Sequence, residues 1–105
     1  MRVVCHSRSA AAVKQAVRSG IDIIGHANYL DDEAVAMLEA ERDRIFVGPG
    51  IAWEVALLDK GSELGLPREA MEQRGYQREV DETISSVKRL RESKVRVLIG
   101  GDYGL

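Results

Sequence analysis

The stretch RVVCHSRSAAAVKQAVRSGIDIIGH (residues 2–26) contains a short β-rich run, a helical pattern and a second β-rich run. Residues 2–5 and 21–24 are rich in Val and Ile, which is typical of strands. Between them, four apolar residues fall on one helical face: Ala10, Val13, Ala16 and Val17. The hydroxyls of Ser7-Arg8-Ser9 can cap the N-terminus of this helix, and Gly20 follows where a helix C-cap belongs. A strand, a helix and a strand with short connections predict a βαβ unit, whose two strands are parallel.

The same alternation continues along the chain. Asp31 or Asp32 can cap a helix that runs to about residue 41, and residues 44–47 predict a third strand that ends at the turn Gly48-Pro49-Gly50. Helices are expected at residues 51–60 and from residue 66 onward. The longest amphipathic pattern has apolar residues at 80, 84, 87 and 90, and residues 95–99 predict a fourth strand. The predicted fold class is α/β with a parallel sheet, and residues 1–105 are read as a single unit.

Composition and charge exclude several classes of protein. Lys and Arg number 15 and Asp and Glu 17, so the net charge is −2 and favours neither nucleic acid nor an anionic membrane as a partner. The apolar runs are far shorter than the roughly 20 residues that a membrane-spanning helix needs. A single cysteine, Cys5, excludes an internal disulfide and fits a reducing compartment, so we expect a cytoplasmic protein.

Three potential metal ligands follow predicted strands. His6 follows the first, His26 the second and Asp102 the fourth, and these are the only two histidines in the chain. The carboxyl ends of parallel strands carry the functional loops of α/β folds. Imidazole and carboxylate groups bind zinc and similar divalent ions. The pattern therefore indicates a shared metal site. The alternative is that the histidines are structural and that Asp102 caps a helix.

Other residues near these strand ends have less distinctive patterns. Cys5 precedes His6, and because side chains alternate along a strand it should point to the opposite face and serve packing. Asn28 and Tyr29 lie just beyond His26, from where they could reach a substrate.

At these residues the sequence resembles a known family. HSRSAAAVKQAVRSGIDIIGHANYLDDEAVAML is similar to the amidohydrolase superfamily, in its imidazolonepropionase-like and prolidase-like branch. There a histidine and an alanine-rich helix lead to a second histidine and then to Asp-Asp-Glu. VRVLIGGDYG looks like the last-strand signature of the same branch, normally Gly-Thr-Asp followed by a small residue and glycine.

The resemblance implies roles for the three residues. His6 and His26 would bind a divalent metal, most simply zinc, and Asp102 would be a ligand to a second metal and the general base. The implied reaction is hydrolysis of an amide, peptide, ester or related bond, with metals polarising the carbonyl and activating water. Gly25 stands where the family often has an acid and Gly101 where it has threonine. Lys94 stands where glycine is common, which would cost stability if that turn needs a positive φ.

Two family elements have no counterpart in residues 1–105: the His-x-His of strand one, and the bridging lysine or acid of strand four. The resemblance thus implies a partial TIM (β/α)8 barrel, holding strands five to eight. Such a piece leaves open sheet edges and an uncovered inner face, so we expect the missing barrel half or a second copy of the chain as a partner. Alone it should be inactive. The substrate would be a small molecule or dipeptide-like. The rival hypothesis is a non-catalytic α/β binding or interaction domain, for example a flavodoxin-like one, with structural histidines.

Overall fold

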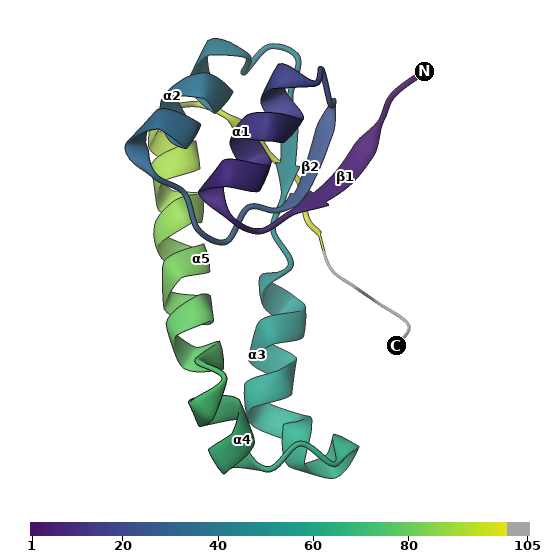
Figure 1. The fold of residues 1–105 in the computed structure, drawn as a ribbon, viewed down its shortest axis with the longest axis vertical. Coiled ribbons are helices and arrows are strands. Elements are labelled where there is room, and N and C mark those ends of the chain that lie inside the picture. The colour runs from purple at the N-terminus through teal and green to yellow at the C-terminus, as the bar shows by residue number, and fades with distance from the viewer. Residues whose placement is uncertain (101–105) are drawn as a thin grey trace.

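A computed structural model describes residues 1–100 of the chain. The elements in chain order are β1 (Val4–Ser7), α1 (Ala10–Arg18), β2 (Ile23–His26), α2 (Asp32–Ala40), β3 (Phe46–Gly48), α3 (Ile51–Lys60), the 3-10 helix η1 (Gly61–Leu64), α4 (Arg68–Gln73), α5 (Tyr76–Glu92) and β4 (Arg96–Val97). The strands form a parallel sheet in the order β1-β2-β3-β4. In Figure 1, α1 and α2 lie over one face of this sheet and the upper part of α5 runs beside them. The predicted α/β class and its parallel sheet are confirmed.

The first helix forms for the reasons that the sequence suggested. The Ser9 side chain accepts a hydrogen bond from the Ala12 backbone N–H at 3.2 Å, which satisfies a donor that the helix leaves unpaired. Val13 and Ala16 are buried, and Gly20 ends the unit at a φ of 75°. The α2 cap is Asp31, whose side chain accepts from the Ala34 N–H at 2.8 Å. Both predicted caps are therefore present.

The first three strands begin and end later than the sequence suggested, whereas β4 is shorter than the predicted strand at residues 95–99. The prediction ended the first two strands before His6 and His26, whereas both histidines belong to the strands themselves. The reason is the pairing between β1 and β2, which continues through His6↔Gly25 and Ser7↔His26. Ladder hydrogen bonds to a neighbouring strand extend a strand beyond its apolar run, and a neighbour's register cannot be read from one segment.

The sheet has one covered face and one open face. Its covered face carries Ile24 and Val47, which pack with residues of α1, α2 and α5 into the hydrophobic core. Cys5 packs against this core too, as predicted. Alternation along the strands places Val4, Ile23, Phe46 and Arg96 on the other face, in register with one another. The guanidinium of Arg96 lies 3.9 Å from the centre of the Phe46 ring.

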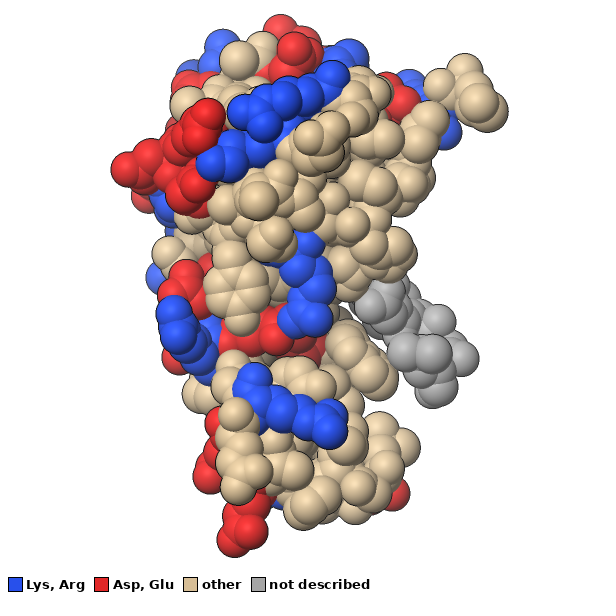
Figure 2. Space-filling view, in the orientation of Figure 1, with Lys and Arg blue, Asp and Glu red and all other residues tan. Residues whose placement is uncertain are grey.

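A helical hairpin extends from the carboxyl ends of the strands. Figure 1 shows α3 leaving the sheet after β3 and α5 returning beside it, with α4 near the far tip. α5 then leads to β4 through Lys94, which has a φ of 56°. This left-handed conformation is the one that glycine adopts most easily, so the predicted cost of lysine at this turn applies. On the face shown in Figure 2, acidic and basic side chains lie intermingled. Among the helices of residues 1–100, none combines the length and apolarity needed to span a membrane.

Candidate metal centre

The two histidines meet at the carboxyl ends of β1 and β2. Nδ1 of His6 lies 2.6 Å from Nε2 of His26, which is hydrogen-bond distance. The ring centroids are 4.8 Å apart and the ring planes are tilted by 36°. His6 is exposed and His26 is half-buried. From the sequence we predicted that the two imidazoles share one end of the sheet, and in the structure they are in direct contact.

A regular strand geometry would have separated these rings. His26 pairs with Ser7, which is buried on the covered face, whereas His6 lies one residue earlier on the open face. Because side chains alternate with a period of two, ideal strands would send the imidazoles to opposite faces. His26 instead has a φ of 76° and Ala27 a φ of 51°. This pair of left-handed residues breaks the alternation and brings the His26 ring beside His6.

That conformation is costly for residues with a Cβ. A left-handed non-glycine residue stores about 1–3 kcal/mol when the surrounding structure imposes it. The Ala27 N–H donates to the Ser7 carbonyl at 2.9 Å, and the Ala27 side chain is 1% exposed. Strain of this kind concentrates at functional sites, where it fixes the direction of a side chain.

Glycines lie beside the imidazoles. A Cβ at Gly50 would lie 2.8 Å from Nδ1 of His26, so a larger residue there would collide with the ring. A Cβ at Gly25 would lie 3.3 Å from the Cys5 carbonyl oxygen but 3.9 Å from Nδ1 of His6, so Gly25 relieves the neighbouring strand and not the ring. The resulting cavity on the open face has a volume of about 270 Å³. Its walls combine the imidazoles and glycines with the apolar side chains of Val4, Ile23, Leu98 and Ile99.

The donor set suits a divalent metal ion of the zinc type. Two nitrogens bound to one tetrahedral zinc lie about 3.3 Å apart, given Zn–N bonds of about 2.0–2.1 Å. The imidazole nitrogens are 2.6 Å apart, so a small separation of the rings would give the chelating geometry. Asp102, the third predicted ligand, lies outside the described residues. Within residues 1–100, no three His, Cys, Asp or Glu side chains are grouped so that they could hold a metal ion.

The two residues predicted to contact substrate have different environments. Asn28 is fully buried, and its side-chain Nδ2 donates to Oε1 of Glu54 and, at 2.7 Å, to Oγ1 of Thr83. Tyr29 is half-buried, and its backbone N–H donates to the Arg8 carbonyl at 3.0 Å. Tyr29 therefore retains an accessible side chain, whereas the Asn28 amide nitrogen is engaged inside the protein.

Sequence reasoning did not identify Glu54 and Thr83, which are 4% and 0% exposed. A signal was present, because each is a polar residue within an apolar helical stripe. Glu54 lies between Ile51 and Leu57 on α3, and Thr83 lies between Val80 and Val87 on α5. A polar residue at a position that should be buried implies a hydrogen-bond partner.

Charged groups line a second cavity that His26 also lines. Arg8 forms an ion pair with Glu79, a buried carboxylate on α5. Together with Glu54 and the rings of Trp53 and Tyr76, they line a polar cavity of about 160 Å³ that also touches His26. Away from this cavity, the Ala34 backbone N–H lowers the pKa of Asp31, and the hydrogen bond to Glu33 raises the pKa of Lys14.

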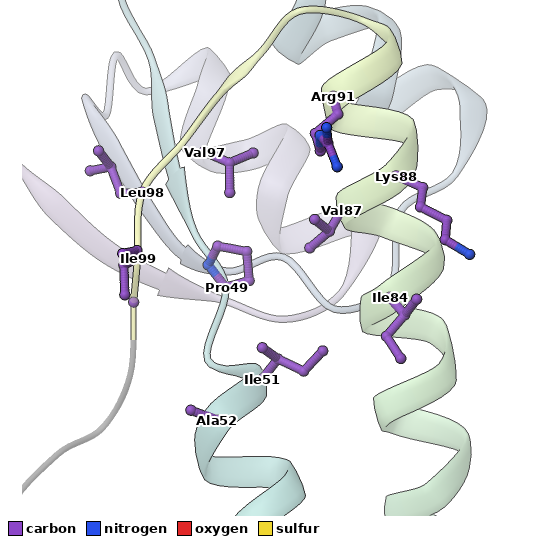
Figure 3. Close-up of a pocket in the computed structure, with 11 residues that line it drawn as sticks. Pro49, Ile51, Ala52, Ile84, Val87, Lys88, Arg91, Val97, Leu98 and Ile99 are labelled. Carbon is purple, nitrogen blue, oxygen red and sulfur yellow. The ribbon is translucent and has the colours of Figure 1, made fainter.

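A larger cavity lies away from the histidines, between α3, α5 and β4. Its volume is about 420 Å³, and Figure 3 shows apolar side chains such as Ile51, Ile84 and Val97 around it. Lys88 and Arg91 at its edge are cations, which cannot serve as metal ligands. The size of this cavity therefore does not make it the candidate metal site.

Comparison with known proteins shows which solved structures this chain is similar to. No family model matches the chain, and no curated protein matches it either. Among solved structures, an amidohydrolase is 26% identical over 97% of this chain, with a TM-score of 0.78. A prolidase complexed with N-methylphosphonate-L-proline is 25% identical over 96%, with a TM-score of 0.77. A Xaa-Pro dipeptidase with methionine bound in its active site is 21% identical over the whole chain, with a TM-score of 0.78, and supports the fold alone.

The matched part of each larger protein is small. The chain spans 24% of the amidohydrolase, 24% of the prolidase and 25% of the dipeptidase. A four-stranded parallel sheet with helices on one face and an open face opposite is what one segment of a (β/α) barrel looks like. In fold, the chain therefore matches one segment of the TIM barrel of amidohydrolase-superfamily structures, at 25–26% sequence identity.

Proposed function

We propose that this chain, holding strands five to eight, is part of a metal-dependent hydrolase that cleaves amide, peptide or related C–N bonds, or esters, through a metal-activated water. The single observation that carries the proposal is the contact between His6 and His26, at 2.6 Å and at the carboxyl ends of adjacent parallel strands. Active sites of (β/α) barrels are built at this end of the strands. The neighbouring structures named as amidohydrolase and prolidase support a hydrolase as the parent.

In this proposal Nδ1 of His6 and Nε2 of His26 hold a divalent metal, most simply zinc. Zinc, when bound, supplies a Lewis acid that polarises a carbonyl and lowers the pKa of water. Asp102 is proposed as a further ligand and as the general base. Val4, Ile23 and Leu98 give the same cavity an apolar wall.

The proposed substrate is a small molecule or a dipeptide-like compound. The prolidase holds N-methylphosphonate-L-proline, and the dipeptidase holds methionine. Tyr29 is proposed as a substrate contact because its side chain is partly exposed beyond β2. Asn28 was predicted alongside it, but it is fully buried and its side-chain amide donates to Glu54 and Thr83.

The proposal includes a partner for the open face. Val4 is 60% exposed and Leu98 40% exposed on the face that carries the histidines. Exposed apolar side chains on a sheet face favour association, and burying them recovers about 25 cal/mol per Å². The partner is either the missing part of the barrel or a second copy of the chain, and the chain alone is proposed to be inactive.

One observation favours a second candidate, a non-catalytic α/β domain with structural histidines. At 2.6 Å the two ring nitrogens are closer than two ligands of one zinc ion, and the distance suits a direct hydrogen bond between imidazoles. In that case the histidine pair would tie β1 to β2 without binding a metal.

Metal titration separates the two candidates. Co²⁺ is added to the chain and binding is followed by calorimetry and by visible absorption, which reports the ligand set. We expect one site, lost in both His6→Ala and His26→Ala. Cys5→Ser is the matched control, since Cys5 neighbours His6 but packs on the covered face, and it should bind as the wild type does. Failure of the wild-type chain to bind, or binding that survives both histidine variants, contradicts a metal centre at this pair.

A further inference from the structure

The hairpin helices hold the segment that carries His26. Three side chains from α3 and α5 converge on Asn28, two residues after the histidine. Glu54 and Thr83 accept from the Asn28 side-chain amide, and Oγ of Ser86 donates to the Asn28 carbonyl at 2.8 Å. These partners lie 26, 55 and 58 residues away in sequence, so the contacts exist only when the hairpin is packed against the sheet.

The chemistry of this network is specific to an amide. Nδ2 of Asn28 has two N–H groups, and each has a partner: the Glu54 carboxylate and the Thr83 hydroxyl. The Thr83 hydroxyl lies 3.0 Å from the other Glu54 oxygen and 2.8 Å from the Glu79 carbonyl, and it donates to one of them. A carboxylate at position 28 would instead face the carboxylate of Glu54 in a site removed from water, where like charges repel strongly.

We propose that Asn28 is a positioning residue for His26, and that Glu54, Thr83 and Ser86 act through it. His26 and Ala27 adopt left-handed conformations, which place the imidazole against His6. An unrestrained segment would relax toward an ordinary strand conformation and carry the ring away from the open face. Asn28 opposes this relaxation because both its side chain and its backbone carbonyl are fixed to the hairpin.

The inference rests on the proposed metal centre and adds a coupling to it. If the hairpin holds His26 in place, metal binding and packing of the hairpin stabilise each other by the same factor. Bound metal should therefore protect the packed hairpin, and weakening the hairpin contacts should weaken metal binding. Neither effect requires catalytic turnover.

The test compares Co²⁺ affinity in variants of the full chain. Asn28→Ala removes the side-chain amide, and Asn28→Asp replaces its N–H donors with a carboxylate oxygen. Thr83→Val replaces the hydroxyl with a methyl group of similar size. Each is expected to weaken Co²⁺ binding at least tenfold. Thr83→Ser keeps the hydroxyl and should bind within threefold of the wild type. Ser85→Ala is the matched control, because Ser85 lies beside Ser86 on α5 but is exposed.

A second readout reports the position of His26 directly. Imidazole ¹⁵N NMR of the metal-free chain should detect the contact between the rings of His6 and His26 in the wild type and in Ser85→Ala, and lose it in Asn28→Ala. Ser86→Ala removes only the hydrogen bond to the Asn28 carbonyl. If Thr83→Val does not fold, the positioning role is tested with this variant instead. It should weaken Co²⁺ binding about fivefold, beyond the threefold range expected of Thr83→Ser.

Two kinds of failure are distinguishable. If the wild type does not bind Co²⁺ through the two histidines, the proposed function fails. If the wild type binds, but folded Asn28 and Thr83 variants bind equally well and retain the contact between the rings, the positioning role is overturned.

Discussion

Replacing Gly50 by alanine tests whether the space around the His26 ring matters. The added Cβ would lie 2.8 Å from Nδ1 and 3.2 Å from Cε1 of His26, whereas ordinary contact begins at 3.4 Å. Gly50 has a φ of −93° and a ψ of 30°, which alanine can adopt, so the backbone itself tolerates the change. The collision with the ring is therefore the dominant effect of the substitution.

The size of the effect follows from these distances. The ring must retreat by about 0.6 Å to restore ordinary contact, while metal–ligand distances are held to within about 0.2 Å. Misplacement of a ligand by disturbing the residues that support it typically weakens metal affinity by about 10–100-fold. We expect at least a tenfold loss of Co²⁺ affinity, which corresponds to about 1.4 kcal/mol.

The assay is calorimetric titration of the chain with Co²⁺, together with thermal unfolding to show that the variant is folded. Gly48→Ala is the control, because its Cβ would meet only the Cα of Gly100, at 4.0 Å, among the described residues. It should bind within threefold of the wild type. Equal affinity of wild type and Gly50→Ala would refute the reasoning, since it would mean that the position of the His26 ring does not decide metal binding.

Three further outcomes are expected. The isolated chain supplied with zinc should not hydrolyse dipeptides; turnover that disappears in Asp102→Asn would contradict this. The chain should self-associate in sedimentation velocity experiments because Val4 and other open-face side chains are exposed, and Val4→Lys should shift it toward monomer; a monomeric wild type would count against the open face as an interface. Because the Ala34 N–H lowers the pKa of Asp31 below its ordinary value of 3.8, the ionised carboxylate stabilises the fold above that value, and this stabilisation is lost as the pH falls through the lowered pKa. The Tm difference between wild type and Asp31→Asn, which retains a capping side chain, should therefore shrink in acid, and a constant difference would show that Asp31 titrates normally.

The sequence predicted correctly those features that depend on residues close together in the chain. Ser9, Gly20 and Asp31 act through neighbours within a few residues, so the caps and the end of the first unit were predictable. The alternation of β-rich and amphipathic segments likewise predicted the parallel α/β sheet. The strand ends were less predictable, because pairing with another strand extends β1 and β2 to include their histidines.

The partners of Asn28 could not be read from the chain. Loop residues beyond a strand resemble substrate contacts in sequence, but Glu54 and Thr83 reach Asn28 only through packing of the hairpin. Their positions in apolar stripes indicated that they would be buried and hydrogen-bonded. Which residue they would bind depended on how α3 and α5 pack against the segment after β2.

The sequence by itself determined the main helices and strands and their order. It did so because helix periods, caps and β-rich runs are local properties. Only the tertiary structure decided that the imidazoles meet, because the regular alternation along β1 and β2 would have placed them on opposite faces. The left-handed His26 and Ala27 reverse that outcome, and their strain persists because contacts from distant parts of the chain hold the segment in place.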